Sequence, residues 1–186
     1  YMSERSPEQI KDVLKNEVDD VMFVDNTHHN LGVAAALNKG LDRAIAEGYD
    51  WLLTMDQDSG FDDGALQLLK DFAFNCNDDI AIVSPFHFIK RTPRSTSVEE
   101  VPFTMTSGNL LRVSAAKKAG MFEEKLFIDS VDNEYCLRLR KNGFSIVRVN
   151  SAILNHKLGK LEDHGPFKTV THSAERRYYI TSNMLY

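Results

Sequence analysis

Short apolar runs alternate with amphipathic segments along the first half of the chain. The runs VMFVDN (21–26), WLLTM (51–55) and IAIVS (80–84) have the length of buried strands, and the segments around them carry apolar residues at helical spacing. Helices are predicted over 6–14, 32–48 and 62–74. Because strands that alternate with helices pair side by side in one sheet, the pattern predicts an α/β domain with a largely parallel sheet.

The second half of the chain has a less regular pattern. Residues 85–102 are polar and are expected to form a surface excursion, and 101–113 then returns to strand character around Ser107-Gly108-Asn109. A short helix ending at Gly120 is expected next, followed by an acidic loop and an amphipathic helix within 127–143. SIVRV (145–149) and AILNH (152–156) are predicted as two strands, and the tail 171–186 has the pattern of a helix start.

Acidic residues follow two of the predicted strands. Asp25 comes after VMFV, and Asp56 and Asp58 come after WLLTM. Ligands of α/β sheets bind beyond the carboxyl ends of the strands, so these carboxylates lie where such a sheet presents its chemistry. Two carboxylates this close repel each other, and a hard cation such as Mg²⁺ or Mn²⁺ would compensate that repulsion. A solvated loop with two acids is the alternative, because an Asp-x-Asp motif alone is a weak signal.

Composition and charge narrow the class of protein. The 186 residues are 42% hydrophobic, which fits one globular domain with a core, and the net charge of −5 argues against a nucleic-acid binder. The two cysteines form no Cys-x-x-Cys pair and are expected to be reduced thiols. No apolar run approaches the roughly 18–20 residues that a membrane helix needs, and a cytoplasmic location is expected.

Two enzyme classes use an Asp-x-Asp motif after a strand. One is the haloacid-dehalogenase-type phosphatase, whose first aspartate is a nucleophile; here Ser59 and Gly60 follow the motif, so the match is partial. That motif also belongs on the first strand of its domain, whereas Asp56 follows a complete strand and helix. The other class is the nucleotide-sugar glycosyltransferase, in which the motif holds a metal on the donor diphosphate.

Several motifs in order make the second class the more specific interpretation. The stretches NLGVAAALNKGLDRAIAEGYDWLLTMDQDSGF and SGNLLRVSAAKKAGMFEEKLFIDSVDNEYCLRLRKNGFSI resemble inverting family 2 glycosyltransferases, in particular the rhamnosyltransferase-like branch, and so does HSAERRYY near 172–179. The resemblance implies a GT-A fold: a three-layer α/β sandwich with a mostly parallel mixed sheet. The chain begins Tyr1-Met2-Ser3 where such proteins have an apolar strand, so 1–186 is expected to be a single GT-A domain truncated at both ends, without its first strand.

The resemblance also implies which residues bind the donor. The implied donor-binding residues are Asp25, Asn30, Asp56, Asp58 and Arg176. Asp25 would contact the base or ribose, and Asp58 would ligate the metal, with His156 completing that site. A histidine at the edge of the core, and an arginine on a solvated helix face, are the alternatives at His156 and Arg176.

The catalytic base implied by the resemblance is Asp132, in the motif VDNE. Asp129 and Glu134 lie within six residues of each other and are expected to be structural or acceptor-side neighbours. A carboxylate in the first turn of a helix is also favoured by the helix dipole, so capping is the alternative role for all of these acids.

The implied reaction is a metal-dependent (Mn²⁺ or Mg²⁺) inverting transfer of a sugar from a dTDP- or UDP-linked donor to a saccharide or lipid-linked glycan, with rhamnose the favoured sugar. A non-catalytic nucleotide-sugar-binding fragment is the second hypothesis. No nucleic-acid partner is expected. The parent protein is expected to act in the cytoplasm, in part at the inner membrane face, and an exposed sheet edge would allow a second copy to pair.

Overall fold

The computed structural model describes residues 6–24, 30–88, 95, 97–156, 161–164, 167–170 and 174–183. At its centre lies one mixed sheet with the strand order β1-β5-β3-β6-β2, and β4 pairs with β6 beside this path. The strands are β1 (Trp51–Thr54), β2 (Ser59–Phe61), β3 (Ile80–Phe88), β4 (Val98–Glu100), β5 (Asn109–Arg112) and β6 (Ser145–His156). The predicted α/β class is confirmed.

The pairing within this sheet differs from the expected parallel majority. Among the described strands, only β3 and β6 pair in parallel, whereas β1–β5, β3–β5, β2–β6 and β4–β6 are antiparallel. Two of these antiparallel pairings arise because β5 enters the sheet between β1 and β3 and runs against both of them, and the other two arise because β2 and β4 each run against β6. An apolar run in a sequence specifies burial and not strand direction, so this proportion could not be predicted from the pattern.

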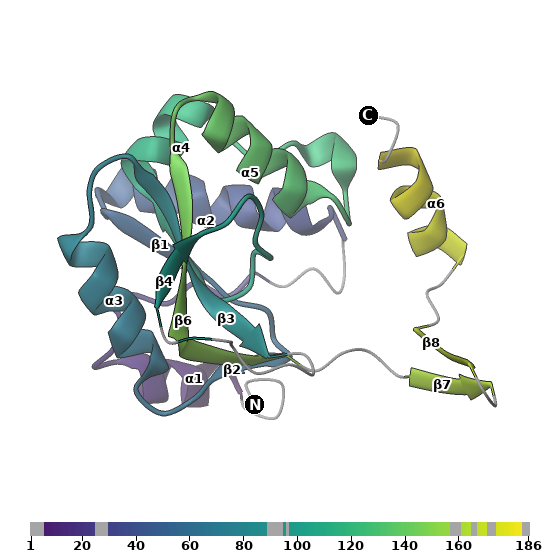
Figure 1. Ribbon diagram of the computed structural model, residues 1–186, viewed down its shortest axis with the longest axis horizontal. Helices are drawn as coiled ribbons and strands as arrows, with labels where there is room; N and C mark the ends of the chain where they lie inside the picture. The colour runs from purple at the N-terminus through teal and green to yellow at the C-terminus, as the bar shows by residue number, and fades with distance from the viewer. Residues whose placement is uncertain are drawn as a thin grey trace.

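Helices cover both faces of the sheet and give the expected three layers (Figure 1). On one face lie α2 (Val33–Glu47), α4 (Val113–Ala119) and α5 (Val131–Lys141), and on the other lies α3 (Ala65–Asn75). Neighbouring strand residues alternate between the layers, because side chains on a strand point alternately to its two faces: Ile82 packs with the α2/α4/α5 layer and Val83 with α3.

The predicted helices are confirmed, and local capping signals mark some of their ends. Helix α1 (Pro7–Leu14) begins with a complete capping box, in which Ser6 accepts from the Gln9 amide and Gln9 accepts from the Ser6 amide. Helix α2 ends at Gly48 in the left-handed conformation. The described part of the tail contains α6 (Ala174–Asn183), after the hairpin of β7 (Leu161–His164) and β8 (Phe167–Val170).

Two strand predictions are wrong. Residues 21–24 form no strand, and Met22 and Phe23 are exposed, because no described strand offers this run a hydrogen-bonding partner. The two strands expected in SIVRV and AILNH form the single strand β6, which continues through Asn150 and Ser151 and shifts register against β3 near Phe86. Part of the expected excursion at 85–102 is also ordered, since β3 extends to Phe88 and β4 begins at Val98.

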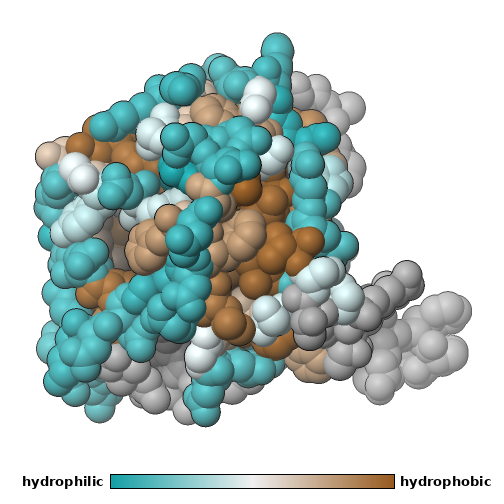
Figure 2. Space-filling view, turned by 60° about the vertical axis from the view of Figure 1, so that its left-hand side comes forward, coloured by the Kyte–Doolittle hydropathy of each residue, from teal (hydrophilic) through white to brown (hydrophobic). Residues whose placement is uncertain are grey.

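The face of the molecule in Figure 2 is hydrophilic around its margin, with an apolar area near its centre. Exposed large apolar side chains include Leu68 and Phe74 on α3 and Phe103 in the loop before β5. No helix in the described ranges has the length and apolar character that crossing a membrane requires.

Candidate functional site

The two carboxylates of the Asp-x-Asp motif lie in a tight turn between β1 and β2. The turn is closed by a hydrogen bond of 3.2 Å from the Ser59 amide to the Asp56 carbonyl. Asp56 is exposed, Asp58 is partly buried and Ser59 is fully buried. The structure therefore places both acids just beyond the carboxyl end of β1, as predicted, and the buried Ser59 ends the turn.

Ser107, in the turn just before β5, fixes the Asp-x-Asp turn. Its hydroxyl accepts a hydrogen bond from the Asp56 amide (3.1 Å) and donates one to the Ser59 hydroxyl (2.9 Å). Ser107 is itself buried, and its carbonyl lies 2.7 Å from the His87 ring nitrogen Nε2. The Ser-Gly motif before β5 thus has a structural function: one hydroxyl joins both sides of the Asp-x-Asp turn.

Gly108 allows the chain to pass through a crowded position beside this serine. Its φ is +79°, and an added Cβ would lie 2.8 Å from Cδ2 of Leu154 and 2.9 Å from Cγ of Pro85. Its amide donates to the Thr54 carbonyl at 2.6 Å, which ties the motif to the last residue of β1. A side chain at this position would displace the motif from the end of β1.

A small recess, with a cavity volume of about 20 Å³, lies between the end of β1 and the start of α5. Its polar lining residues are Thr54, Thr104, Thr106, Asn109 and Asp132, and its apolar ones are Ile82, Leu111, Phe122, Tyr135 and Cys136. Asn109 is 4% exposed and donates to the Met105 carbonyl, while its Oδ1 atom has no hydrogen-bond partner among the described residues. A buried acceptor without a partner is unfavourable, and it gives the recess one unused polar contact beside Asp132.

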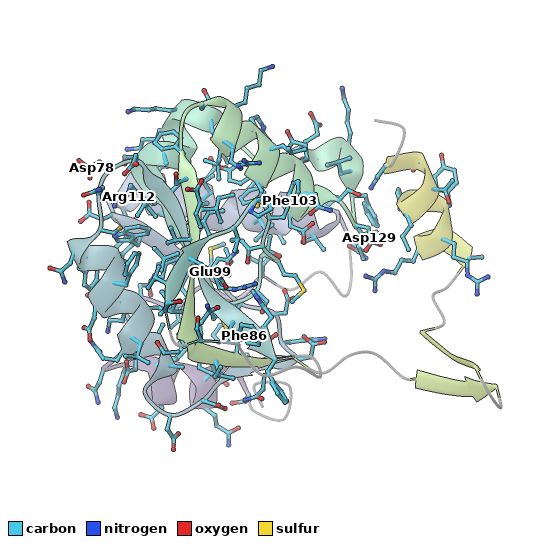
Figure 3. The ribbon with its side chains drawn as sticks, in the orientation of Figure 1. Asp78, Phe86, Glu99, Phe103, Arg112 and Asp129 are labelled. Carbon is cyan, nitrogen blue, oxygen red and sulfur yellow. The ribbon has the colours of Figure 1, made fainter. Side chains whose placement is uncertain are left out.

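The three acids near the start of α5 have different partners. Asp129 is held by Arg176 of α6 through two hydrogen bonds of 2.9 and 3.0 Å, and it lies on the side of the domain that faces α6 (Figure 3). Glu134 is held by Arg138 of the same helix through bonds of 2.8 and 2.6 Å. Asp132 forms no ion pair within the described ranges, and its Oδ1 accepts from the Asn133 amide at 2.9 Å.

The environment of Asp132 makes its carboxylate more basic. Burial raises the pKa of Asp132 above its usual value, and the charge of Asp129 raises this pKa further, while hydrogen bonds from backbone amides oppose both effects. A carboxylate with a raised pKa binds a proton more readily, which is the property a general base needs. Helix α5 begins at Val131, within the range predicted for it, so Asp132 lies in the first helical turn.

The loop before α5 has an unusual backbone conformation and close neighbours. Phe127, Asp129 and Ser130 have φ values of 57°, 61° and 63°. The Phe127 carbonyl accepts from the Val33 amide at the start of α2 (2.7 Å), where Gly32 leaves room for it. Asn30 is exposed, and its side chain accepts from the Gly32 amide at 2.9 Å. The predicted donor-side residue Asn30 thus bonds to Gly32, the residue that leaves room for the Phe127 carbonyl.

The predicted metal ligands are Asp58 and His156. In the antiparallel pairing of β2 with β6, Ser59 lies directly opposite His156, so Asp58 is next to a residue in register with this histidine. The side chain of His156 and all of Asp25 lie outside the described residues. In the part of the chain that is described, no three His, Cys, Asp or Glu side chains form a group that could hold a metal. The backbone pairing of β2 with β6 nevertheless brings the positions of Asp58 and His156 near each other, and an aspartate carboxylate is a ligand that suits Mn²⁺ or Mg²⁺.

Sequence reasoning missed the residues that hold the site together. Ser107 and Gly108 were noticed only as part of a motif, and the contacts of Asn183 with the loop before α5 were not predicted. Local patterns could not reveal these contacts, because each joins residues far apart in the chain. Cys136 is buried and Cys76 partly buried, both as free thiols, and burial raises the pKa of Cys136 to about 11.

Comparison with known proteins identifies related chains. The family model described as glycosyl transferase family 2 matches residues 3–134. A curated relative, dTDP-rhamnosyl transferase RfbF of Shigella flexneri, is 28% identical over 173 residues, which cover 83% of this chain and 58% of that protein. The chain therefore spans well under two thirds of the length of this relative.

Solved structures share the fold. A197 from STIV superposes with a TM-score of 0.56 at 15% identity, covering 88% of this chain and 91% of that one. S. aureus TarS 1-349 superposes with a TM-score of 0.54 in its complex with UDP (16% identity, 80% of this chain, 47% of that one). Its complex with UDP-GlcNAc superposes with a TM-score of 0.55 at 14% identity, covering 82% of this chain and 47% of that one. At these identities the likeness concerns the fold, which is the expected GT-A arrangement.

Proposed function

Because the chain belongs to glycosyl transferase family 2, we propose that it transfers a sugar from a nucleoside-diphosphate donor to a glycan acceptor with inversion at the anomeric carbon. The relative's name, a dTDP-rhamnosyl transferase, favours a dTDP-linked donor, and the UDP complexes of TarS make a UDP-linked donor the second choice. The acceptor is proposed to be a saccharide or a lipid-linked glycan.

One observation carries the assignment of the general base. Of the three acids around the start of α5, Asp129 and Glu134 each hold an arginine, and Asp132 alone has no cation among the residues described. It also lines the recess next to the end of β1. Asp132 would take the proton of the acceptor hydroxyl as that oxygen attacks, while the Asn133 amide orients the carboxylate. Asp129 and Glu134 are proposed to shape the acceptor side.

The donor is proposed to bind above the turn between β1 and β2. Asp56 would face the ribose, and Asp25 and Asn30 would contact the nucleoside side. Arg176 is proposed as a further contact of the diphosphate, although two of its N–H groups bind Asp129. Asp58 and His156 would hold a Mn²⁺ or Mg²⁺ ion. Such a cation neutralises the charge of a leaving diphosphate. The hydrogen bonds of Ser107 hold the turn in place.

Thermal unfolding with UDP and with dTDP, each with and without Mn²⁺, tests the donor site. A ligand that binds only the folded state stabilises it, by about 2.7 kcal/mol at a hundredfold excess over Kd. We expect a shift that requires Mn²⁺ and is lost in Asp58→Ala. Asp63→Ala is the matched control, because Asp63 is an exposed acid in the loop before α3. No shift with either nucleotide, or an equal loss in Asp63→Ala, would contradict the proposal.

A further inference from the structure

The segment that carries Asp132 into the site contains three non-glycine residues with positive φ. They are Phe127, Asp129 and Ser130, at 57°, 61° and 63°. Residues other than glycine rarely adopt such φ angles, because the Cβ atom then crowds the backbone. Such a conformation persists only where surrounding contacts hold it, and it is common where a site needs an exact geometry. Some contact must therefore hold residues 127–130.

Helix α6 supplies contacts of this kind from a distant part of the sequence. The side-chain amide nitrogen Nδ2 of Asn183 lies within hydrogen-bond distance of three carbonyl oxygens, those of Leu126 (2.7 Å), Ile128 (2.8 Å) and Asp129 (2.9 Å). An amide nitrogen has two hydrogens, so these three carbonyls share them. Carbonyl groups that point toward one nitrogen are held at a fixed separation and cannot rotate independently.

Two further contacts join the same helix to the same segment. Arg176 binds both carboxylate oxygens of Asp129. The rings of Tyr179 and Phe127 stack with their centres 4.7 Å apart. Helix α6 therefore contacts the segment in three ways: Asn183 binds backbone carbonyls, Arg176 binds a carboxylate, and Tyr179 stacks on a ring. Figure 3 shows Asp129 on the side of the domain toward α6. These contacts between α6 and residues 126–129 are called the α6 clasp below.

On its other side the segment meets the start of α2. The Phe127 carbonyl accepts from the Val33 amide, and an added Cβ on Gly32 would lie only 2.5 Å from that oxygen. The segment is thus enclosed between α2 and α6, and α5 begins directly after it at Val131. The position of Asp132, the second residue of α5, depends on this conformation.

We propose that Asn183 is a positioning residue, which holds residues 127–130 in their positive-φ conformation and thereby fixes the carboxylate of Asp132 at the recess. This role rests on the proposed function of Asp132 as the base. Asn183 does not line the recess and acts only through the segment that it binds. Arg176 and Tyr179 support the same clasp.

Nuclear magnetic resonance on the full chain tests this role without any nucleotide. The three-bond coupling between the α hydrogen and the preceding carbonyl carbon is large only at positive φ and reports φ at Asp129 and Ser130, and the carboxyl carbon shift reports the titration of Asp132. In Asn183→Ala we expect the positive-φ couplings to disappear and the pKa of Asp132 to fall toward that of an ordinary carboxyl group, because a released loop gains solvent. Thr181→Ala is the matched control, since Thr181 is exposed on α6 and bonds only to the Arg177 carbonyl in the described contacts.

A second substitution separates positioning from general stability. Ser130→Gly removes the penalty of positive φ without removing a cap, because the Ser130 side chain forms no capping hydrogen bond. Added to Asn183→Ala, it should bring the couplings and the Asp132 titration part of the way back to their values in the parent chain. A variant whose fold was merely weakened would show no such recovery. Asn183→Ser, too short to reach three carbonyls, gives the same test should the alanine variant unfold.

The outcomes distinguish this role from the proposed function. Unchanged couplings and an unchanged Asp132 titration in Asn183→Ala would overturn the positioning role, whatever the nucleotides do. Where a donor supports turnover, Asn183→Ala should lower kcat by about tenfold, as expected for hydrogen bonds lost at one side chain, and leave KM for the donor nearly unchanged. A rise in KM for the donor with kcat unchanged would also overturn the positioning role.

Discussion

At the scale of single residues, the partners of each carboxylate distinguish their roles. Asp129 and Glu134 are held by arginines in two-bond contacts, so their charges are already compensated. Asp132 is partly buried without such a cation among the described residues, and its pKa is raised by burial. A structural acid is stabilised by its partner, whereas a base must keep its lone pairs available. This contrast favours Asp132 over its two neighbours.

Replacing Asp132 by asparagine should remove the base and keep the shape of the site. We expect turnover in Asp132→Asn to fall by about 10²–10⁴-fold, the usual contribution of a general base, with Mn²⁺-dependent nucleotide binding retained. Steady-state kinetics and calorimetry measure the two quantities. Asp42→Asn, an exposed acid on α2, serves as the control and should match the parent chain. Turnover near the parent rate in Asp132→Asn would exclude Asp132 as the base.

The raised pKa of Asp132 also predicts how activity and stability depend on pH. The ionised form is the base, so activity should fall as the pH drops through the pKa of Asp132, at a pH above the usual aspartate value of about 3.9. The folded state binds this proton more tightly than the unfolded state, so the stabilisation is present at low pH and is lost as the pH rises through the raised pKa. Relative to the parent chain, Asp132→Asn should therefore gain stability from acidic to neutral pH. Chemical denaturation at several pH values measures this difference, and a difference independent of pH would contradict it.

At the scale of elements, the start of α2 and the loop before α5 depend on each other through Gly32. Gly32 and Gly48 have φ values of 90° and 78°, but an added Cβ meets Phe127 only at Gly32, whereas at Gly48 it meets nothing within 4 Å. Gly48→Ala should cost about 1 kcal/mol of unfolding free energy, from the backbone alone. Gly32→Ala should cost clearly more, because the backbone carbonyl of Phe127 must move. Denaturant unfolding compares the two, and equal losses would show that the contact between α2 and this loop contributes little.

Elements that depend on local signals could be predicted from the sequence, and those that depend on distant partners could not. Helices α1, α2 and α5 follow from caps and spacing within one segment. The strand expected at 21–26 is wrong over its described part, 21–24, where the chain has no strand partner, and β2 was missed, because its three residues pair with residues 154–156. The same division holds for the site. The positions of Asp58 and Asp132 at element ends were predicted, whereas the contacts of Ser107 and Asn183 required the fold.

At the scale of the whole molecule, the two helical layers contribute differently to the site. The layer with α2, α4 and α5 includes Phe122 and Tyr135, whose rings stack 3.9 Å apart and line the recess. The α3 layer packs on the opposite face of the sheet and, among the described residues, contributes no side chain to the recess. Both layers stabilise one domain, but only the first should determine the geometry around Asp132.

Two matched core substitutions test this division. Leu139 of α5 and Leu69 of α3 are both fully buried, one in each layer. Either change to alanine should lower the free energy of unfolding by about 2–5 kcal/mol, the usual range for a buried leucine. Only Leu139→Ala should also shift the pH dependence of turnover, because Leu139 shares a helix with Asp132 and a core with the rings at the recess. A comparable shift in Leu69→Ala would mean that the sheet transmits packing changes to Asp132, and that the site depends on both layers.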